Sequence, residues 1–142
     1  MLDRPQIEAI IPHRDPFLML DRVVEMVPGE YAIAEKDILD TLDVFRGHFP
    51  GDPIFPGVLQ IEALAQAGAV AVLAHPENKG KIVLFAAVDN VRFKRPVVPG
   101  DTLRLETRMV EGRGRIGRGE GKAYVGSTLV CSGTLTFAVV ER

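Results

Sequence analysis

The segment from Val58 to about Ala74 leaves this chain the least freedom in how it folds, because it is apolar almost all the way round a helix. A helix without a polar face is buried on every side. We therefore predict a central helix that is itself the core of the fold. Its few polar residues are Gln60, Glu62 and Gln66.

A loop rich in proline and glycine, from His48 to Pro56, leads into this helix. Its prolines remove backbone donors and bias the preceding residues toward extended geometry, so the loop cannot be helical. The first amides of the helix, those of Gly57 and Val58, have no intrahelical acceptor, and amides in that position bind anions and oxyanions. We expect a rigid loop that holds His48 just before this helix N-terminus.

Glu62 and Gln66 are one helical turn apart, so their side chains share a face and can form a hydrogen bond. Burial in an apolar wall raises a carboxyl pKa, which lets Glu62 hold a proton near neutral pH. Considered alone, Glu62 fits equally well as a buried carboxylate satisfied by Gln66 or an arginine, and a loop histidine such as His48 is more often structural or solvated. Together with the helix N-terminus they provide a base, an acid and an oxyanion site.

The segment HFPGDPIFPGVLQIE, from His48 to Glu62, closely resembles the signature of the β-hydroxyacyl-acyl carrier protein dehydratases of type II fatty acid synthesis, the FabZ type. The segments Ile11–Val23 and Val91–Asp101 match the same family, so the likeness covers essentially the whole chain. It implies a hot-dog fold, in which an antiparallel sheet wraps around a long central helix.

Hydrophobic periodicity predicts the other elements. A short helix is expected over residues 5–11, and a single helical turn around Val44 and Phe45. Strands are expected over residues 18–27, 31–38, 82–88, 103–109 and 129–140. The continuous apolar run 82–88 is typical of a strand covered on both faces, and the alternation in 103–109 of a half-buried strand. One buried helix and mostly sequential strands imply an α+β fold, with residues 1–142 as a single domain.

The resemblance implies elimination of water from a (3R)-3-hydroxyacyl thioester on acyl carrier protein, giving a trans-2-enoyl thioester. His48 would then take the C2 proton, Glu62 would protonate or position the departing hydroxyl, and Gln66 would orient Glu62. The helix-start amides, Gly57 first and Val58 beside it, would bind the enolate-like oxygen. The family also implies a homodimer in which the histidine of one chain meets the glutamate of the other in an acyl tunnel, commonly assembled as three dimers.

Two basic clusters are visible in the sequence. Such charges usually form a solvated surface, but the resemblance offers an alternative, a landing site for the strongly acidic acyl carrier protein. We assign that role to the first cluster. The first cluster is Arg92, Lys94 and Arg95, and the second is Arg113, Arg115, Arg118 and Lys122.

Charge and cysteine content exclude several classes of protein. The net charge of -2 excludes a strongly basic nucleic-acid binder. Cys131 is the only cysteine, so an internal disulfide is impossible and a reducing compartment is favoured. The N-terminus lacks the pattern of a secretion signal, and the apolar helix contains Glu62 and is short for a membrane span. We expect a cytoplasmic protein.

No cofactor and no metal site are predicted. The segment from Gly112 to Gly117 fits the dinucleotide pattern G-x-G-x-x-G, but a turn and a strand are expected after it where that motif requires a helix. The sequence has no Walker motif, no Cys-x-x-Cys and no histidine pair at helical spacing. His13 is more often a structural or solvated residue in such a position, and His75 fits an electrostatic role at the helix C-terminus.

Three other functions stay open at this point. FabA-type dehydratase-isomerases are closely similar but usually have aspartate where this chain has Glu62, which favours dehydration without isomerisation. A hot-dog thioesterase would hydrolyse the thioester and release free thiol. A non-catalytic acyl-binding or scaffold protein would tolerate replacement of His48 and Glu62.

Overall fold

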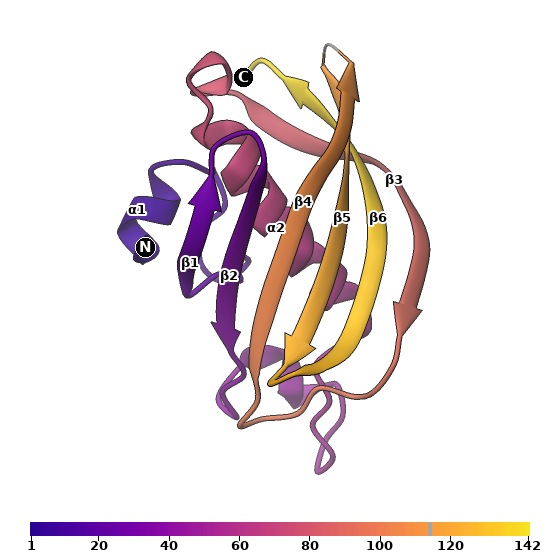
Figure 1. Cartoon of the computed structure of the whole chain (residues 1–142). Helices are drawn as coiled ribbons and strands as arrows, with labels where there is room; N and C mark the ends of the chain where they lie inside the picture. Colours follow the sequence, from indigo (N-terminus) through magenta and orange to yellow (C-terminus); the bar gives the residue numbers. More distant parts are fainter. Residues whose placement is uncertain (114) are drawn as a thin grey trace.

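In the computed structural model, which describes residues 1–113 and 115–142, six antiparallel strands form one curved sheet around helix α2 (Figure 1). The strand order is β1-β2-β4-β5-β6-β3, so β1 and β3 are the edges. This arrangement confirms the predicted α+β hot-dog fold. The strands are β1 Arg22–Val27, β2 Tyr31–Asp37, β3 Ile82–Phe93, β4 Thr102–Arg113, β5 Ile116–Val125 and β6 Thr128–Val140.

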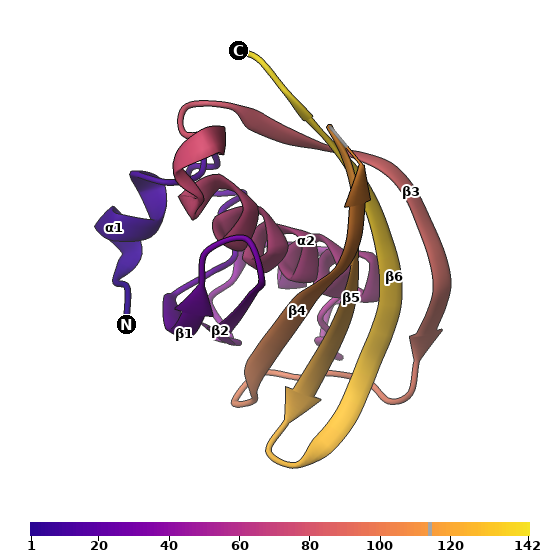
Figure 2. The ribbon, with the colours of Figure 1, turned by 45° about the horizontal axis from the view of Figure 1, so that its top comes forward.

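Helix α2, Gly57–Ala74, lies inside the curve of the sheet and contacts strands from both halves of it, as Figure 2 shows from above. The predicted core helix is confirmed, because nearly all residues from Gln60 to Leu73 are buried. By length and composition α2 also qualifies as a membrane span, but 67% of it is buried inside the protein, as in the core helix of a soluble domain. Its most exposed residue is Val58 in the first turn, at 72%.

Two elements predicted near the N-terminus, the first helix and the first strand, are longer than the elements observed in the structure. Helix α1, Arg4–Glu8, ends three residues before Ile11, where Arg14 donates hydrogen bonds to the carbonyl groups of Glu8 and Ile11. Strand β1 begins at Arg22 and not at residue 18, because the backbone just before it hydrogen-bonds the side chain of Gln66 on α2 and so cannot pair with a strand. Tertiary contacts thus override the local pattern.

Most of the remaining elements follow the prediction. The expected helical turn is the 3-10 helix η1, Asp43–Arg46, and a second one, η2, Pro76–Asn78, follows α2. The strands predicted over 31–38, 103–109 and 129–140 correspond to β2, β4 and β6. In β4 the buried residues Leu103 and Leu105 alternate with more exposed ones, as expected for a half-buried strand.

The strand predicted over residues 82–88 is confirmed as part of β3, but the expectation that both of its faces are covered is wrong within the single chain. The strand continues to Phe93, and most of its residues are exposed in the single chain. The reason is its position: after α2 the chain crosses to the outer side of β6, so β3 lies at one end of the sheet, where α2 contacts it less than it contacts β2, β4, β5 or β6. Periodicity reports an apolar strand but carries no information about which neighbour covers it.

Candidate active site

A cavity of about 220 Å³ lies between α2 and the inner face of the sheet. Its wall is mainly apolar, and Glu62 and His13 are the ionisable groups among the described residues that line it. A concave apolar cavity with a few convergent polar groups is typical of a small-molecule site. The other lining residues are Phe17, Ala65, Gly68, Ala69, Val83, Leu84, Phe85, Thr107, Met109, Gly119, Leu135 and Phe137.

Glu62 projects from the second turn of α2 into this wall, and its side chain is 20% exposed. Burial raises the pKa of its carboxyl group, and a hydrogen bond from Gln66 lowers that pKa by a smaller amount. The bond is the one expected from the sequence: Gln66 Nε2 donates to Glu62 Oε2 at 3.0 Å. Glu62 is therefore a carboxyl group whose protonated form is favoured by its surroundings.

Gln66 is almost completely buried and all its polar atoms have partners. Its Oε1 accepts from the Met19 amide at 2.7 Å, and its Nε2 also donates to the Phe17 carbonyl oxygen at 3.0 Å. Because the amide oxygen is occupied by a backbone N–H, the amide nitrogen must be the atom that faces Glu62. The segment before β1 thus holds Gln66 in one orientation, and Gln66 holds Glu62.

His13 also lies in the cavity, which the sequence did not predict. Its Nε2 is 3.9 Å from Glu62 Oε2, and its ring stacks on Phe17 with 6.4 Å between ring centroids. Burial, and secondarily the charge of Arg14, lower the pKa of His13 and favour its neutral form. The only sequence signal was its place in the recognised segment Ile11–Val23; no spacing connects it to Glu62.

His48 lies on the proline-rich loop, half-buried, with its ring stacked on Phe49. Its Nδ1 is 2.8 Å from the carbonyl oxygen of Ile54. A carbonyl oxygen only accepts, so Nδ1 carries the hydrogen and Nε2 is left free to take up a proton. The same loop is closed by a hydrogen bond from the Ile54 amide to the His48 carbonyl oxygen at 3.1 Å.

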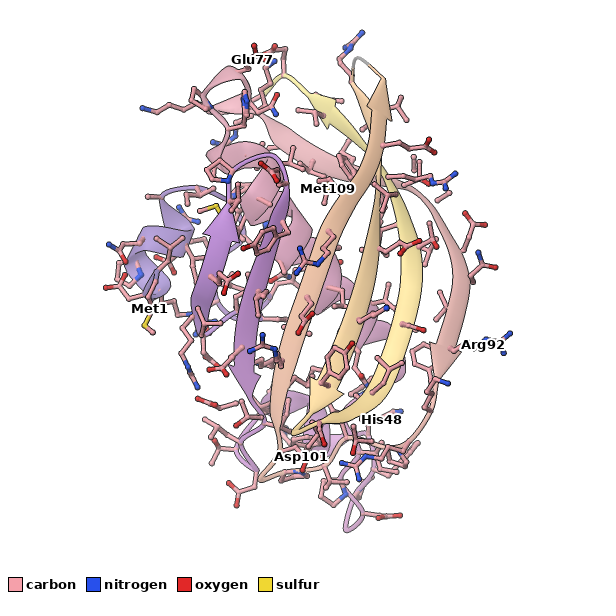
Figure 3. All side chains as sticks on the ribbon, viewed as in Figure 1. Met1, His48, Glu77, Arg92, Asp101 and Met109 are labelled. Atoms are coloured by element: carbon pink, nitrogen blue, oxygen red, sulfur yellow. The ribbon has the colours of Figure 1, made fainter. Side chains whose placement is uncertain are left out.

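The single chain does not bring His48 to Glu62. His48 is not among the described residues that line the Glu62 cavity. In Figure 3 it lies at the lower end of the molecule, whereas Met109, which does line the cavity, lies in the upper half. The two predicted acid–base groups are thus separate within one chain.

The start of α2 has the features expected of an anion-binding helix N-terminus. Its N-cap residue, Pro56, makes no side-chain capping hydrogen bond, so the first amides of the helix are not capped by that residue. A Cβ atom on Gly57 would lie 2.7 Å from Cε1 of Phe93, so only glycine fits beneath that ring without displacing it. Val58 follows with its side chain exposed.

The first basic cluster lies close to this helix start. Arg92, Lys94 and Arg95 are exposed and flank Phe93, whose ring packs on Gly57. Figure 3 shows Arg92 projecting outward from β3. The contact between Phe93 and Gly57 therefore connects a positively charged surface to the proposed oxyanion site.

The second basic cluster is partly neutralised. Arg118 forms an ion pair with Glu111 at 3.0 Å, while Arg115 and Lys122 are exposed, and the side chain of Arg113 lies outside the described residues. The glycine pattern nearby is followed by strand β5 and not by a helix, with Gly114 outside the described residues. Within residues 1–113 and 115–142 no group of three or more His, Cys, Asp or Glu side chains is arranged to hold a metal ion.

Comparison with known proteins assigns the family. The model of the FabA-like domain matches residues 11–134. A protein of Symbiobacterium thermophilum named 3-hydroxyacyl-acyl carrier protein dehydratase FabZ is 58% identical over 132 residues, covering 93% of each chain. A protein of the same name from Roseiflexus castenholzii is 56% identical over 143 residues, covering all of both chains.

Solved structures share the fold at lower identity. The dehydratase heterocomplex ApeI:P of Xenorhabdus doucetiae has a TM-score of 0.79 at 19% identity, covering 93% of this chain and 89% of the other. An uncharacterized protein from Pyrococcus horikoshii has a TM-score of 0.72 at 21% identity, covering 94% and 93%. With the sequence relatives above, the chain belongs to the FabA-like family, within which it is a FabZ-type dehydratase.

Proposed function

We propose that this protein removes water from (3R)-3-hydroxyacyl-acyl carrier protein and forms trans-2-enoyl-acyl carrier protein, in type II fatty acid synthesis in the cytoplasm. The curated relatives named for this reaction are more than half identical over nearly the whole chain. The single observation that supports the chemistry best is Glu62, a carboxyl group in an apolar cavity whose pKa is raised by burial and whose position is held by Gln66.

The elimination needs a base, an acid and stabilisation of charge on the thioester oxygen. His48 Nε2 takes a proton from C2, while the Gly57 amide, beside that of Val58, donates to the oxygen as enolate charge develops. One such donor contributes about 3 kcal/mol. Glu62 then gives its proton to the hydroxyl on C3, the C3–O bond breaks, water leaves and the C2–C3 double bond forms. General acid and base groups each contribute about two to four decades in rate.

The complete site needs two subunits in this proposal, with His48 of one chain serving Glu62 of the other. His48 lies outside the cavity of its own chain, which supports this division. Strand β3 supports a dimer as well, because it is an unpaired edge strand of 12 residues with exposed apolar side chains, and such edges favour pairing with another chain. Assembly into a trimer of dimers is part of the proposal. The exposed side chains are Leu84, Phe85, Val88 and Phe93.

The acyl carrier protein is proposed to dock on Arg92, Lys94 and Arg95. These cations are exposed beside the start of α2, where an acidic partner would deliver its thioester to the Gly57 amide. Replacing Lys94 and Arg95 with glutamate is expected to raise KM for carrier-bound substrate and to leave short soluble thioesters little affected. Equal losses on both substrates would remove the docking role.

Incubation of the protein with 3-hydroxyacyl-acyl carrier protein, followed by mass spectrometry, tests the proposed function directly. Loss of water is the expected result, and Glu62→Gln and His48→Ala are expected to abolish most of it. Full turnover by Glu62→Gln would overturn the assigned acid. The alternatives give different results: release of free thiol would indicate a thioesterase, and no change in mass a binding protein. An isomerase product has the same mass as the trans-2-enoyl product, so chromatography of the products is needed to identify a shifted double bond.

A further inference from the structure

The Glu62 cavity shares a wall with a second cavity of about 420 Å³. Met109 on β4 and Phe137 on β6 line both cavities. Both side chains are half-buried, as expected for groups with open space on two sides. Met109 and Phe137, the partition pair, therefore separate the two cavities.

The side chains of the partition pair pack against glycine residues. A Cβ atom on Gly119 of β5 would lie 3.0 Å from Cε of Met109, and one on Gly117 would lie 2.6 Å from Cζ of Phe137. From the helix side, a Cβ atom on Gly68 would lie 3.5 Å from the same Met109 methyl group. Glycine inside a strand lowers its stability and marks a close approach. The two side chains thus fill space that these glycines leave open.

The chemistry of the lining changes across the partition pair. On the Glu62 side, apart from Glu62, His13, Thr107 and the partition pair itself, the lining consists of glycine and of alanine, valine, leucine and phenylalanine side chains. On the other side the cavity is lined by several polar or charged residues: His75, Glu77, Asn78, Glu111 and Arg115. An alkyl chain is stabilised by burial only while it stays in the apolar part.

We propose that Met109 and Phe137 form the end wall of the acyl cavity and set the chain length that the enzyme prefers. This inference rests on the proposed function, because it takes the Glu62 cavity as the place where the acyl chain lies. Met109 has a flexible side chain that adapts to irregular space, and Phe137 has a rigid aromatic ring that packs against Gly117. Removing either joins the two cavities.

Met109→Ala and Phe137→Ala are therefore expected to raise kcat/KM for long-chain 3-hydroxyacyl substrates relative to short ones. Each additional methylene that becomes buried is worth up to about fourfold. The gain ends once the chain reaches the polar lining of the second cavity. Substrates too short to reach the partition pair keep the kcat/KM of the wild-type enzyme.

The experiment is a competition assay with short-, medium- and long-chain 3-hydroxyacyl-acyl carrier protein in one mixture, with the enoyl products measured by mass spectrometry. Met109→Leu keeps the volume of the wall, and Ile116→Ala enlarges only the far side, since Ile116 lines the second cavity and not the Glu62 cavity. Both controls are expected to keep the wild-type ratio of long to short products. Phe137→Leu replaces Phe137→Ala if thermal unfolding shows that the alanine variant is not folded.

An unchanged ratio in folded Met109→Ala and the folded Phe137 variant would overturn the inference, and so would an equal shift in Ile116→Ala. These results differ from failure of the proposed function, in which the wild-type protein forms no enoyl product at any chain length.

Discussion

At the level of single residues, the site depends on hydrogen bonds that leave each group one role. The Ile54 carbonyl oxygen makes Nδ1 of His48 the protonated nitrogen, and Gln66 presents its amide nitrogen to Glu62 because the Met19 amide occupies its oxygen. These partners, the Ile54 carbonyl oxygen and the Met19 amide, are backbone groups. In the proposed mechanism, these hydrogen bonds leave His48 Nε2 free to accept a proton and hold Glu62 where it can donate one.

Gln66→Leu tests how much the hydrogen bonds of Gln66 contribute to stability and to turnover. The substitution leaves the buried Met19 amide without an acceptor, which costs about 1–3 kcal/mol of folding free energy, and removes a donor from the part-buried Phe17 carbonyl oxygen. Glu62 also loses its orienting donor, so kcat is expected to fall by up to about a hundredfold. Gln60→Leu is the matched control, because Gln60 is equally buried on α2 but its Oε1 has no hydrogen-bond partner among the described residues. Equal effects of the two substitutions would contradict the role of Gln66.

The raised pKa of Glu62 predicts a pH dependence of stability. Because this pKa is higher in the folded state than in the unfolded chain, protonated Glu62 stabilises the fold at low pH. That stabilisation is lost as the pH rises from the ordinary glutamate pKa of about 4.3 through the higher folded-state value. Glu62→Gln lacks the titration, so the wild-type protein is expected to become less stable relative to Glu62→Gln as the pH rises. Urea unfolding of both proteins over this range measures the difference, and parallel curves would exclude a raised pKa.

At the level of secondary structure elements, α2 and β5 pack closely because β5 carries glycines on its inner face. A Cβ atom on Gly121 would lie 3.1 Å from Cδ1 and 3.2 Å from Cβ of Leu64, which is fully buried. On the neighbouring strand, the Thr107 hydroxyl donates to the Leu64 carbonyl oxygen at 2.7 Å. The distance between helix and sheet is thus set at Leu64, two residues after Glu62 in the same helix.

Gly121→Val is expected to destabilise the fold by about 1–3 kcal/mol, because the added side chain forces α2 away from the sheet. The shift should also lower kcat, since Glu62 moves with the helix. Glu120→Val adds the same side chain to the exposed face of β5 and is expected to change stability by less than about 0.5 kcal/mol. Thermal unfolding of both variants measures the change in stability. If Gly121→Val is as stable as the wild-type protein, the contact between Gly121 and Leu64 does not set the distance between α2 and β5.

For the molecule as a whole, His48 does not line the cavity of Glu62 in its own chain, so the proposed site is incomplete within one chain. Glu62 has a cavity without His48, and β3 presents exposed apolar side chains along an unpaired edge. Pairing two chains along β3 would cover this edge in both, because a twofold axis makes the same strand meet itself. A dimer therefore explains two features of the single chain that have no function on their own.

Mixing two inactive variants tests the shared site. In a dimer of His48→Ala with Glu62→Gln, one site contains both substitutions and the other contains neither. After subunit exchange, activity is expected to recover to about a quarter of the wild-type value, because half of the dimers are mixed and each has one intact site. Co-expression of the double variant His48→Ala, Glu62→Gln with either single variant is the control and should stay inactive. Absence of recovery in verified mixed dimers would locate both groups in the same chain.

Local patterns in the sequence were sufficient for the core helix, for the Glu62–Gln66 pair and for the half-buried strand β4. Each depends on residues within a few positions of one another, where helical and strand periodicity fix which side chains share a face. The catalytic candidates His48 and Glu62 also came from the sequence, through their motif. Their roles remain predictions.

Other features depend on which surfaces meet after the chain has folded. His13 lies near Glu62 in a segment before β1 that is held by Gln66, and β3 is exposed where it lies beyond β6, away from most of α2. The partition pair exists because β4 and β6 lie on either side of a glycine-containing β5. Strand order and close packing depend on residues that are far apart in the sequence, so local periodicity cannot predict them. The cavity wall is therefore known only from the tertiary structure.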